Sequence, residues 1–403
     1  MSLIENPNRH LSYLQQCLSS DKRPLGLFLG AGCPMSILRA VDKGPLIPDI
    51  AGLTKIVRGE LAKSKECGAF LKEIEKQFQE DGRPDATVED MLTQVRALRA
   101  VAGNAEVRGL SAAALDKLDG MICSLIHKVV DTPLPTNATP YHHAASWVDD
   151  VRRSNCVEIF TSNYDLLMEQ AFEECRVPYF DGFAGVRRPF FDLRAMEEDA
   201  LPARWARLWK LHGSINWYQV QDKGVFRGTT KEDGASTRVI HPSYLKYQEG
   251  RRMPYLAMMD RLRAFLKQPT SALVLCGYSF RDEHINEVIV QALESTPTAM
   301  AFALLHGRMA RYPQAVALAL GRANLAVLAR DGAVVSARES TWPEKDAASV
   351  SADDGLGVEW APPATGSDLR RAEFTLGDFS VFGQFLRQLV GSARRSLEVA
   401  GAK

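Results

Sequence analysis

Three short apolar runs, each followed at once by a polar motif, constrain this sequence most. Leu25–Leu29 leads into Gly30-Ala31-Gly32, Val157–Thr161 into Ser162-Asn163-Tyr164-Asp165, and Leu208–Leu211 into His212-Gly213-Ser214. An apolar run of four or five residues that ends at glycine or a polar turn is typical of a buried strand. Helical segments lie between the runs, and this alternation predicts an α/β fold: a Rossmann-type parallel sheet with helices on both faces.

The rest of the chain extends this pattern. Further strands are expected at Ala272–Cys276, Ala299–Leu305 and Leu325–Leu328, with helices at Leu11–Leu18, Leu166–Glu174, Tyr255–Leu266, Asp282–Leu293 and Ala315–Leu320. Apolar residues from about Leu53 to Val130 recur in steps of three and four, which indicates a helical insertion subdomain at about 50–130. Residues 1–330 then form the main expected domain, which contains this insertion. Residues 331–370, rich in small and polar residues from 340, are expected to be a linker, and 371–403 a C-terminal helix.

Composition narrows the class of protein. The chain has 403 residues, 46% hydrophobic and 24% charged, as expected for a folded globular protein. Forty-nine basic residues balance 49 acidic ones, so net charge does not indicate nucleic acid as the partner. The longest apolar runs are far shorter than a membrane span needs, and the first residues lack a signal-peptide pattern, so no membrane association is expected.

The seven cysteines are scattered along the chain. No two lie closer than sixteen positions apart, so there is no CxxC pair and no zinc site is expected. An odd, dispersed set is typical of reduced thiols, which indicates a cytoplasmic protein.

Each polar motif has a chemical interpretation and a structural one. Gly30, Ala31 and Gly32 could let the backbone approach a diphosphate, or they could form a tight turn without a ligand. Asn163 and Asp165 could reach one pocket, or they could cap a helix. His212 could be a general base, or a histidine satisfied on the surface or in the core. The carboxyl ends of strands in such a sheet are where ligands bind, which favours the chemical interpretation.

The motifs are more specific as a set. At ordinary residue usage each of the tripeptides GAG, NYD and HGS is expected on the order of 0.1 times or fewer in such a chain. All three occur in order, each behind an apolar run. This set resembles the sirtuin family, with its glycine-alanine-glycine loop, Thr-x-Asn-x-Asp motif and His-Gly motif. Two later segments resemble the divergent bacterial branch of that family: Gly277–Asp282 with Ile285-Asn286, and Val239–Lys246.

The resemblance implies an activity and site residues. It implies an NAD hydrolase that cleaves the nicotinamide–ribose bond to give nicotinamide and ADP-ribose, with Asn163 and His212 catalytic. It implies that NAD, as substrate, contacts Gly30, Ala31, Gly32, Asp165, Gly277, Ser279 and Asp282, with Ser279 and Asp282 on the adenosine side. Protein-deacylating sirtuins carry a zinc ribbon of two cysteine pairs after the catalytic histidine. This chain has no cysteine between Cys175 and Cys276, and Cys33-Pro34-Met35 precedes Ser36 in its glycine loop.

These departures fit the sirtuin-like effectors of bacterial antiphage defence, which act by NAD depletion. The resemblance therefore also implies a homo-oligomer that is held inactive at rest, with a helicase-like translocase ATPase as partner. Two alternatives stay open: an NAD-dependent protein deacylase or ADP-ribosyltransferase that uses the same pocket, and a non-catalytic nucleotide-binding module.

Overall fold

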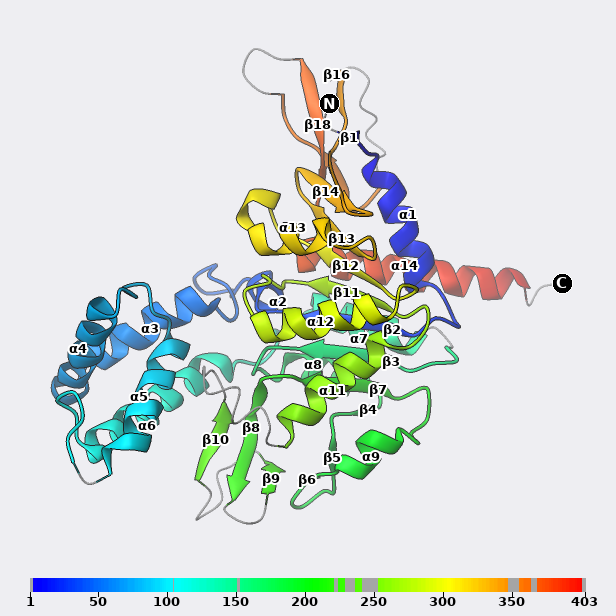
Figure 1. Ribbon diagram of the computed structural model, residues 1–403. Coiled ribbons are helices and arrows are strands. Elements are labelled where there is room, and N and C mark those ends of the chain that lie inside the picture. The colour runs from blue at the N-terminus through cyan, green and yellow to red at the C-terminus, as the bar shows by residue number, and fades with distance from the viewer. Residues whose placement is uncertain are drawn as a thin grey trace.

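The computed structural model of the chain describes residues 3–103, 105–150, 153–220, 224–228, 236–240, 253–346, 355–363 and 368–400 (Figure 1). The segment 241–246, part of the resemblance noted above, lies outside these residues. None of the described helices is both long enough and apolar enough to cross a membrane.

A large sheet forms the centre of the molecule. Its strands, in chain order, are β1 (Leu3–Ile4), β2 (Leu25–Leu29), β3 (Val157–Thr161), β4 (Tyr179–Phe180), β7 (Ala206–Lys210), β11 (Ala272–Cys276), β12 (Met300–Leu304), β13 (Leu325–Ala329), β14 (Gly332–Val335) and β15 (Arg338–Thr341). They lie in the order β1-β15-β14-β13-β12-β11-β2-β3-β7-β4. From β13 to β4 every neighbouring pair is parallel.

The sheet has the Rossmann arrangement that the sequence predicts. Renumbered from β2 in chain order, the six main strands β7, β3, β2, β11, β12 and β13 lie as 3-2-1-4-5-6. The order reverses between β2 and β11, which pair in register from Leu25 with Ala272 to Leu29 with Cys276. This switch point is where open sheets of this kind bind ligands.

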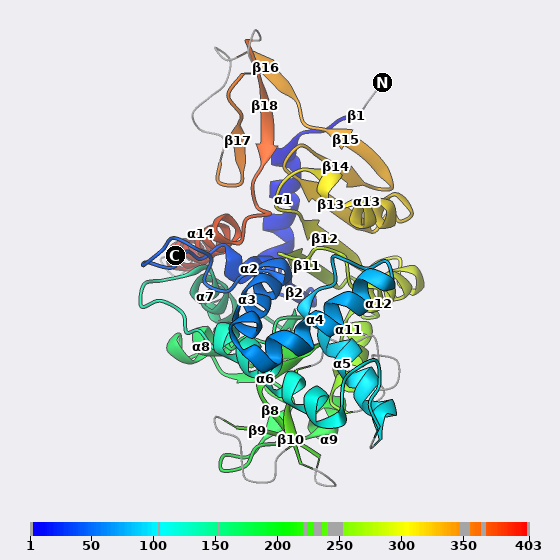
Figure 2. The same cartoon turned by 90° about the vertical axis from the view of Figure 1, so that its left-hand side faces the viewer.

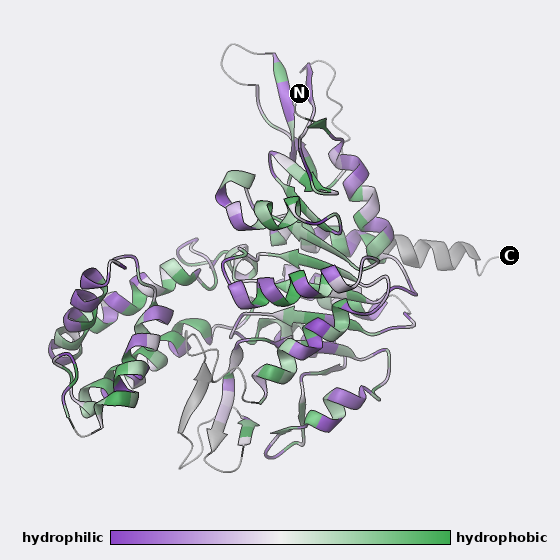
Figure 3. Cartoon of the chain, in the orientation of Figure 1, coloured by the Kyte–Doolittle hydropathy of each residue, from purple (hydrophilic) through white to green (hydrophobic). Residues whose placement is uncertain are grey.

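Helices cover both faces because the main strands are buried on both sides. Alternate strand residues enter two separate cores. The strands at the centre of the molecule are accordingly coloured mostly as hydrophobic in Figure 3. One core includes Leu27 and Ile159 and is closed by α1 (Pro7–Leu18), α7 (Pro140–Asp150), α8 (Leu167–Glu174) and α14 (Phe379–Ala400). The other includes Phe28 and Phe160 and is closed by α11 (Tyr255–Leu266), α12 (Glu283–Ser295) and α13 (Pro313–Leu320).

The helical insertion predicted at about 50–130 is present. It comprises α3 (Ile50–Lys63), α4 (Lys65–Glu80), α5 (Val88–Ala102) and α6 (Ala112–Val130), which project to one side of the sheet (Figures 1 and 2). Asp49, Ser64, Thr87 and Ser111 cap the four N-termini with side-chain oxygens. The short α2 (Gly32–Met35) connects the glycine loop toward this block.

A smaller antiparallel sheet is formed by strands that precede and follow β7 in the chain. It contains β5 (Phe183–Ala184), β6 (Phe190–Phe191), β8 (Gly213–Val220), β9 (Gly224–Arg227) and β10 (Ser236–Ile240), in the order β10-β8-β9-β6-β5. The helix α9 (Leu193–Glu198) lies between β6 and β7 in the chain. The chain therefore continues from His212 directly into a β-hairpin.

Residues 331–370, expected to be a linker, contain several β-strands in the structure. Within 331–370, β14 and β15 extend the main sheet, and a third sheet contains β16 (Glu344–Asp346), β17 (Val358–Trp360) and β18 (Leu369–Phe374). The turn residues Ser336 and Ala337, both at positive φ, join β14 to β15. Short strands with few apolar residues do not stand out from a linker by composition. The helix after 371 begins only at Phe379, because β18 occupies the residues up to Phe374.

Candidate functional site

The glycine loop and the turn after β11 meet at the switch point in direct backbone contact. Gly30 N donates to Cys276 O and Gly32 N donates to Gly277 O, each at 2.9 Å. A Cβ on Gly30 would lie 2.3 Å from Gly277 O, and Gly277 itself has φ +68°. Glycine is therefore required at positions 30, 32 and 277, because no side chain fits between the two turns. Ala31, between Gly30 and Gly32 in the chain, is exposed.

Asn163 is joined to this loop. Its side-chain Nδ2 donates to Gly30 O at 3.1 Å, and its backbone N donates to Thr161 Oγ1 at 3.0 Å. Thr161 Oγ1 in turn donates to Leu29 O at 2.7 Å. The Asn163 amide is thus held beside the glycine loop at the carboxyl ends of β2 and β3.

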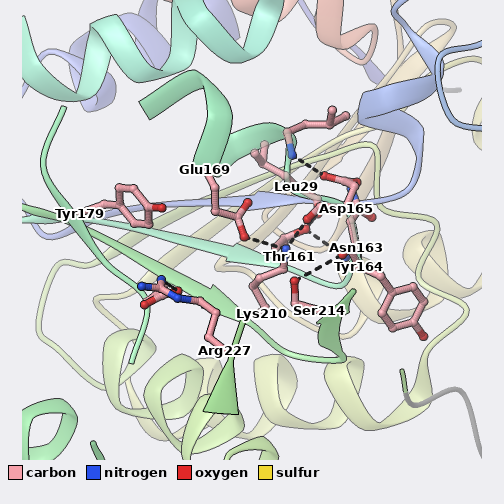
Figure 4. A network of polar contacts seen from close by, with 12 residues as sticks. Leu29, Thr161, Asn163, Tyr164, Asp165, Glu169, Tyr179, Lys210, Ser214 and Arg227 are labelled. Atoms are coloured by element: carbon pink, nitrogen blue, oxygen red, sulfur yellow. Dashed lines mark hydrogen bonds and ion pairs between the residues drawn. The ribbon is translucent and has the colours of Figure 1, made fainter. Parts of the chain in front are cut away.

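Asp165 is turned inward. Its Oδ1 accepts the Leu167 N–H at 3.1 Å, within the turn that leads into α8. Lys210, also buried, donates to Asp165 O and, at 2.8 Å, to Glu169 Oε1 (Figure 4). Burial raises the pKa of Asp165 to about 6, although the Lys210 ammonium opposes that shift.

His212 lies beside Asp282. The distance from His212 Nε2 to Asp282 Oδ2 is 3.0 Å, and each side chain is 13% exposed. The pair is within ion-pair distance, but Nε2 has no partner in hydrogen-bond geometry among the described residues. Asp282 Oδ1 accepts the N–H groups of His284 and Ile285 at 3.0 and 3.1 Å and caps α12. The carboxylate is therefore fixed by one oxygen while the other faces the imidazole.

The backbone joins the two polar turns. Leu211 N donates to Thr161 O at 2.8 Å, and Ile215 N donates to Tyr164 O at 3.0 Å. The Tyr164 and His212 rings have centroids 6.4 Å apart. The asparagine turn and the histidine turn thus form one unit.

Tyr164 is a site residue to which the sequence analysis gave no role. Its hydroxyl donates to Glu89 Oε1 of α5 at 3.3 Å, so the helical insertion contacts the polar motif. Burial, with the Glu89 carboxylate, holds the pKa of Tyr164 well above its ordinary value. Its place between Asn163 and Asp165 in the motif was the available signal.

The structure brings most of the predicted residues together. Gly30, Gly32, Gly277 and Asn163 form one contact cluster, and His212 and Asp282 form a pair at the ends of β7 and α12. Ser279 lies exposed on the turn after β11. Within the described ranges, no group of three or more histidine, cysteine or acidic side chains is placed to hold a metal ion.

The arrangement can hold a polar ligand and move a proton. A histidine beside a fixed carboxylate can accept a proton from a bound hydroxyl or from water, since the carboxylate stabilises the charged imidazole. The Asn163 amide offers both donor and acceptor atoms from a fixed turn. Both groups lie at carboxyl ends of strands, where a ligand can reach them.

Part of the chain matches a known family. Residues 157–324, from the start of β3 to just before β13, match the model of the SIR2-like domain family. A search of curated proteins gave no match.

Three solved structures of Sir2 proteins are similar to this chain at low sequence identity. A Sir2 enzyme structure described for its mechanism and regulation shares 13% identity, with a TM-score of 0.35, over 74% of this chain and 86% of that one. A Sir2 homologue–NAD complex shares 12% identity, with a TM-score of 0.35, over 77% and 88%. A mutant Sir2 homologue–ADP-ribose complex shares 11% identity, with a TM-score of 0.33, over 73% and 84%. On the family match, residues 157–324 of the chain are similar to the SIR2-like domain family.

Proposed function

We propose that this protein binds NAD at the switch point and cleaves the bond between nicotinamide and ribose. The observation that carries the proposal is the His212–Asp282 pair, with Nε2 and Oδ2 3.0 Å apart at strand and helix ends beside the glycine turns. Because Nε2 faces the carboxylate, the other ring nitrogen, Nδ1, is the one proposed to accept a proton from the substrate or from water.

The proposed reaction is a hydrolysis. The glycosidic C–N bond breaks and its electron pair goes to the nicotinamide nitrogen, whose positive charge makes it a good leaving group. An oxocarbenium-like ribose forms in the transition state, and a water oxygen bonds to the same carbon. The proton of that water goes to His212, and the products are nicotinamide and ADP-ribose.

Each residue has a proposed part in this reaction. Asn163, fixed to Gly30 O, orients the ribose hydroxyls or the attacking water. Gly30, Ala31 and Gly32, with Gly277, let the diphosphate approach the backbone, and Ser279 contacts the adenosine side. Asp282, expected to bind the adenosine side, is proposed instead to position His212, which it faces. Asp165 is proposed to support the Asn163 turn rather than to contact NAD, because its buried carboxylate bonds the Leu167 N–H.

The wider role is proposed on the resemblance alone. It includes NAD depletion in antiphage defence, a cytoplasmic location, a homo-oligomer and activation by a translocase ATPase. No zinc is expected to be needed. The rate of NAD cleavage per protomer, followed against protein concentration with and without that partner, tests the oligomer and the activation together.

The experiment on the chemistry follows nicotinamide and ADP-ribose in purified protein incubated with NAD. Release of both products without an acylated peptide supports hydrolysis. Release that requires an acyl-lysine peptide would indicate a deacylase. Labelling of a protein substrate would indicate ADP-ribose transfer, and binding without turnover in every assembly state would indicate a non-catalytic module.

A further inference from the structure

The turn that joins β11 to α12 carries two residues of the proposed site, Gly277 and Asp282. Gly277 lies against the glycine loop, since Gly32 N donates to Gly277 O at 2.9 Å. The Asp282 carboxylate lies 3.0 Å from His212 Nε2. The conformation of the residues between them, 278–281, therefore decides where both groups lie.

The backbone of this turn is strained at Phe280. This residue has φ +59°, in the left-handed region, although it is not glycine and its side chain is buried. That conformation costs a residue with a Cβ about 1–2 kcal/mol, so it persists only where surrounding contacts hold it. The Phe280 and Tyr278 rings have centroids 4.8 Å apart, and those of Tyr278 and Phe28 are 4.7 Å apart. These rings anchor the side chains of the turn, whereas its buried backbone groups depend on hydrogen bonds.

Asn286 supplies hydrogen bonds to this turn from the start of α12. Its Nδ2 donates to Phe280 O at 2.7 Å, and its Oδ1 accepts from the Tyr278 hydroxyl at 2.8 Å. The same hydroxyl lies 3.2 Å from Asp282 O, to which Asn286 N donates at 3.0 Å. Asn286 is only 8% exposed, so its bonds are shielded from water. One amide side chain thus ties the strained residue to the backbone of Asp282.

The Asp282 carboxylate has little freedom once its backbone is fixed. Its Oδ1 accepts the N–H groups of His284 and Ile285 at 3.0 and 3.1 Å, and its Oδ2 faces His212. A displacement of about 1 Å in a catalytic group can cost about 10²-fold in rate. The contacts of Asn286 therefore affect the proposed base through Asp282.

We propose that Asn286 is a positioning residue of this site, which holds the turn at Phe280 and thereby sets the distance between Asp282 and His212. Tyr278 contributes to the same task through its hydroxyl. The Asn286 side chain is not proposed to touch NAD. This inference rests on the proposed function, because it concerns the base of that reaction.

Steady-state NAD cleavage by the full chain tests the proposal with two substitutions. Asn286→Leu is similar in size and removes both amide bonds, whereas Tyr278→Phe removes only the hydroxyl and keeps the ring. We expect kcat to fall about 10-fold in the first and about 3–10-fold in the second, with KM changed less than about 2-fold, because a positioning group acts mainly in the transition state. In an Asp282→Asn background, Asn286→Leu should cause almost no further loss, since both changes act through one carboxylate.

Asn324→Leu is the matched control. The Asn324 Nδ2 also donates to backbone carbonyls, those of Leu293 at 2.9 Å and Ala299 at 3.1 Å. Asn324 immediately precedes β13, so it lies at the opposite edge of the parallel sheet from the site. Its replacement should lower the melting temperature and leave the kcat of the folded protein unchanged.

A second readout does not use turnover. In protein with isotope-labelled histidine, the ring signal of His212 is identified by its absence from His212→Ala. It should shift in Asn286→Leu in the same direction as in Asp282→Asn, and it should stay in place in Asn324→Leu. A wild-type protein that does not cleave NAD would contradict the proposed reaction, and these shifts would still test the positioning.

Two results would overturn the proposal. One is a folded Asn286→Leu protein, verified by its melting curve, with the kcat of the wild type and an unmoved His212 signal. The other is a loss of kcat in the double variant that equals the product of the two single losses, because Asn286 would then act independently of Asp282. If Asn286→Leu does not fold, the same comparisons are made with Tyr278→Phe.

Discussion

At the scale of single residues, Asp282 connects helix stability to chemistry. One of its oxygens caps α12 and the other lies 3.0 Å from His212 Nε2. Asparagine is nearly as good an N-cap as aspartate, so Asp282→Asn keeps the cap and removes only the charge beside the imidazole. We expect the variant to lower kcat for NAD cleavage about 10–100-fold with KM nearly unchanged, because a positioning group acts mainly in the transition state.

The steady-state parameters distinguish this role from the one that the sequence suggested. A carboxylate that binds the adenosine side would contribute equally to ground and transition states, so its loss would raise KM and spare kcat. Glu283→Gln is a matched control, since Glu283 is the next residue, is exposed and belongs to the same first turn of α12.

Asp165 gives a prediction on pH. Burial raises its pKa from an ordinary 3.8 to about 6 in the folded chain. Between these values the unfolded chain has released this proton and the folded chain still holds it. This residue therefore makes the free energy of unfolding fall as pH rises from about 4 to about 6, by roughly 3 kcal/mol in total. Asp165→Asn keeps an oxygen for the Leu167 N–H and should lack this decrease.

Urea denaturation of both proteins at pH 4, 5, 6 and 7 measures this effect. The wild type should lose stability relative to the variant across that window. Parallel stability curves would show that Asp165 is ionised in the folded chain at ordinary pH.

At the scale of elements, contact between two turns holds the switch point together. A Cβ on Gly30 would lie 2.3 Å from the carbonyl oxygen of Gly277, and backbone cannot move aside as a side chain can. Gly30→Ala should therefore destabilise the fold by about 2 kcal/mol or more, by separating β2 from β11 at their ends. Gly59→Ala is the control, because nothing lies within 4 Å of a Cβ there.

Thermal or urea unfolding distinguishes the two substitutions. Gly59 lies inside α3, where alanine is the better helix former, so its replacement should stabilise by about 0.5–1 kcal/mol. Equal effects of the same sign at both positions would contradict the packing argument.

The helical insertion gives the second prediction at this scale. Its α5 reaches the polar motif through the bond from Tyr164 to Glu89. If the insertion limits access to the site, Glu89→Gln should weaken this contact and raise the basal rate of NAD cleavage about 3–10-fold. Glu66→Gln, in the first turn of α4 and outside the contact, should leave the rate unchanged. A basal rate that falls or stays the same in the Glu89 variant would show that the contact does not restrain the enzyme.

At the scale of the whole molecule, strong local patterns decided what the sequence could predict. The runs at β2, β3 and β11 were found with their bounds because each is mostly apolar and ends at glycine or a polar turn. The helix α7, which Pro140 opens, was not foreseen, since no helix was expected between about residue 130 and Leu166. Proline is tolerated in the first turn of a helix, so it marks a beginning as well as an end.

Contacts between distant segments could not be predicted. His212 and Asp282 lie seventy positions apart, and no local pattern pairs them. Ser380 Oγ of the C-terminal helix α14 donates to Ser36 O at 3.0 Å, which joins α14 to the end of α2. Such pairs depend on the strand order, which alternation of strands and helices leaves open.

Release of nicotinamide and ADP-ribose from NAD is the most direct test of the central claim. The measurement uses wild-type protein, His212→Ala and Asn163→Ala, each verified as folded by its melting curve. The account predicts turnover by the wild type without any peptide substrate, and a decrease of roughly 10²–10⁴-fold in each variant. Turnover that is undiminished in the folded His212→Ala protein would contradict it.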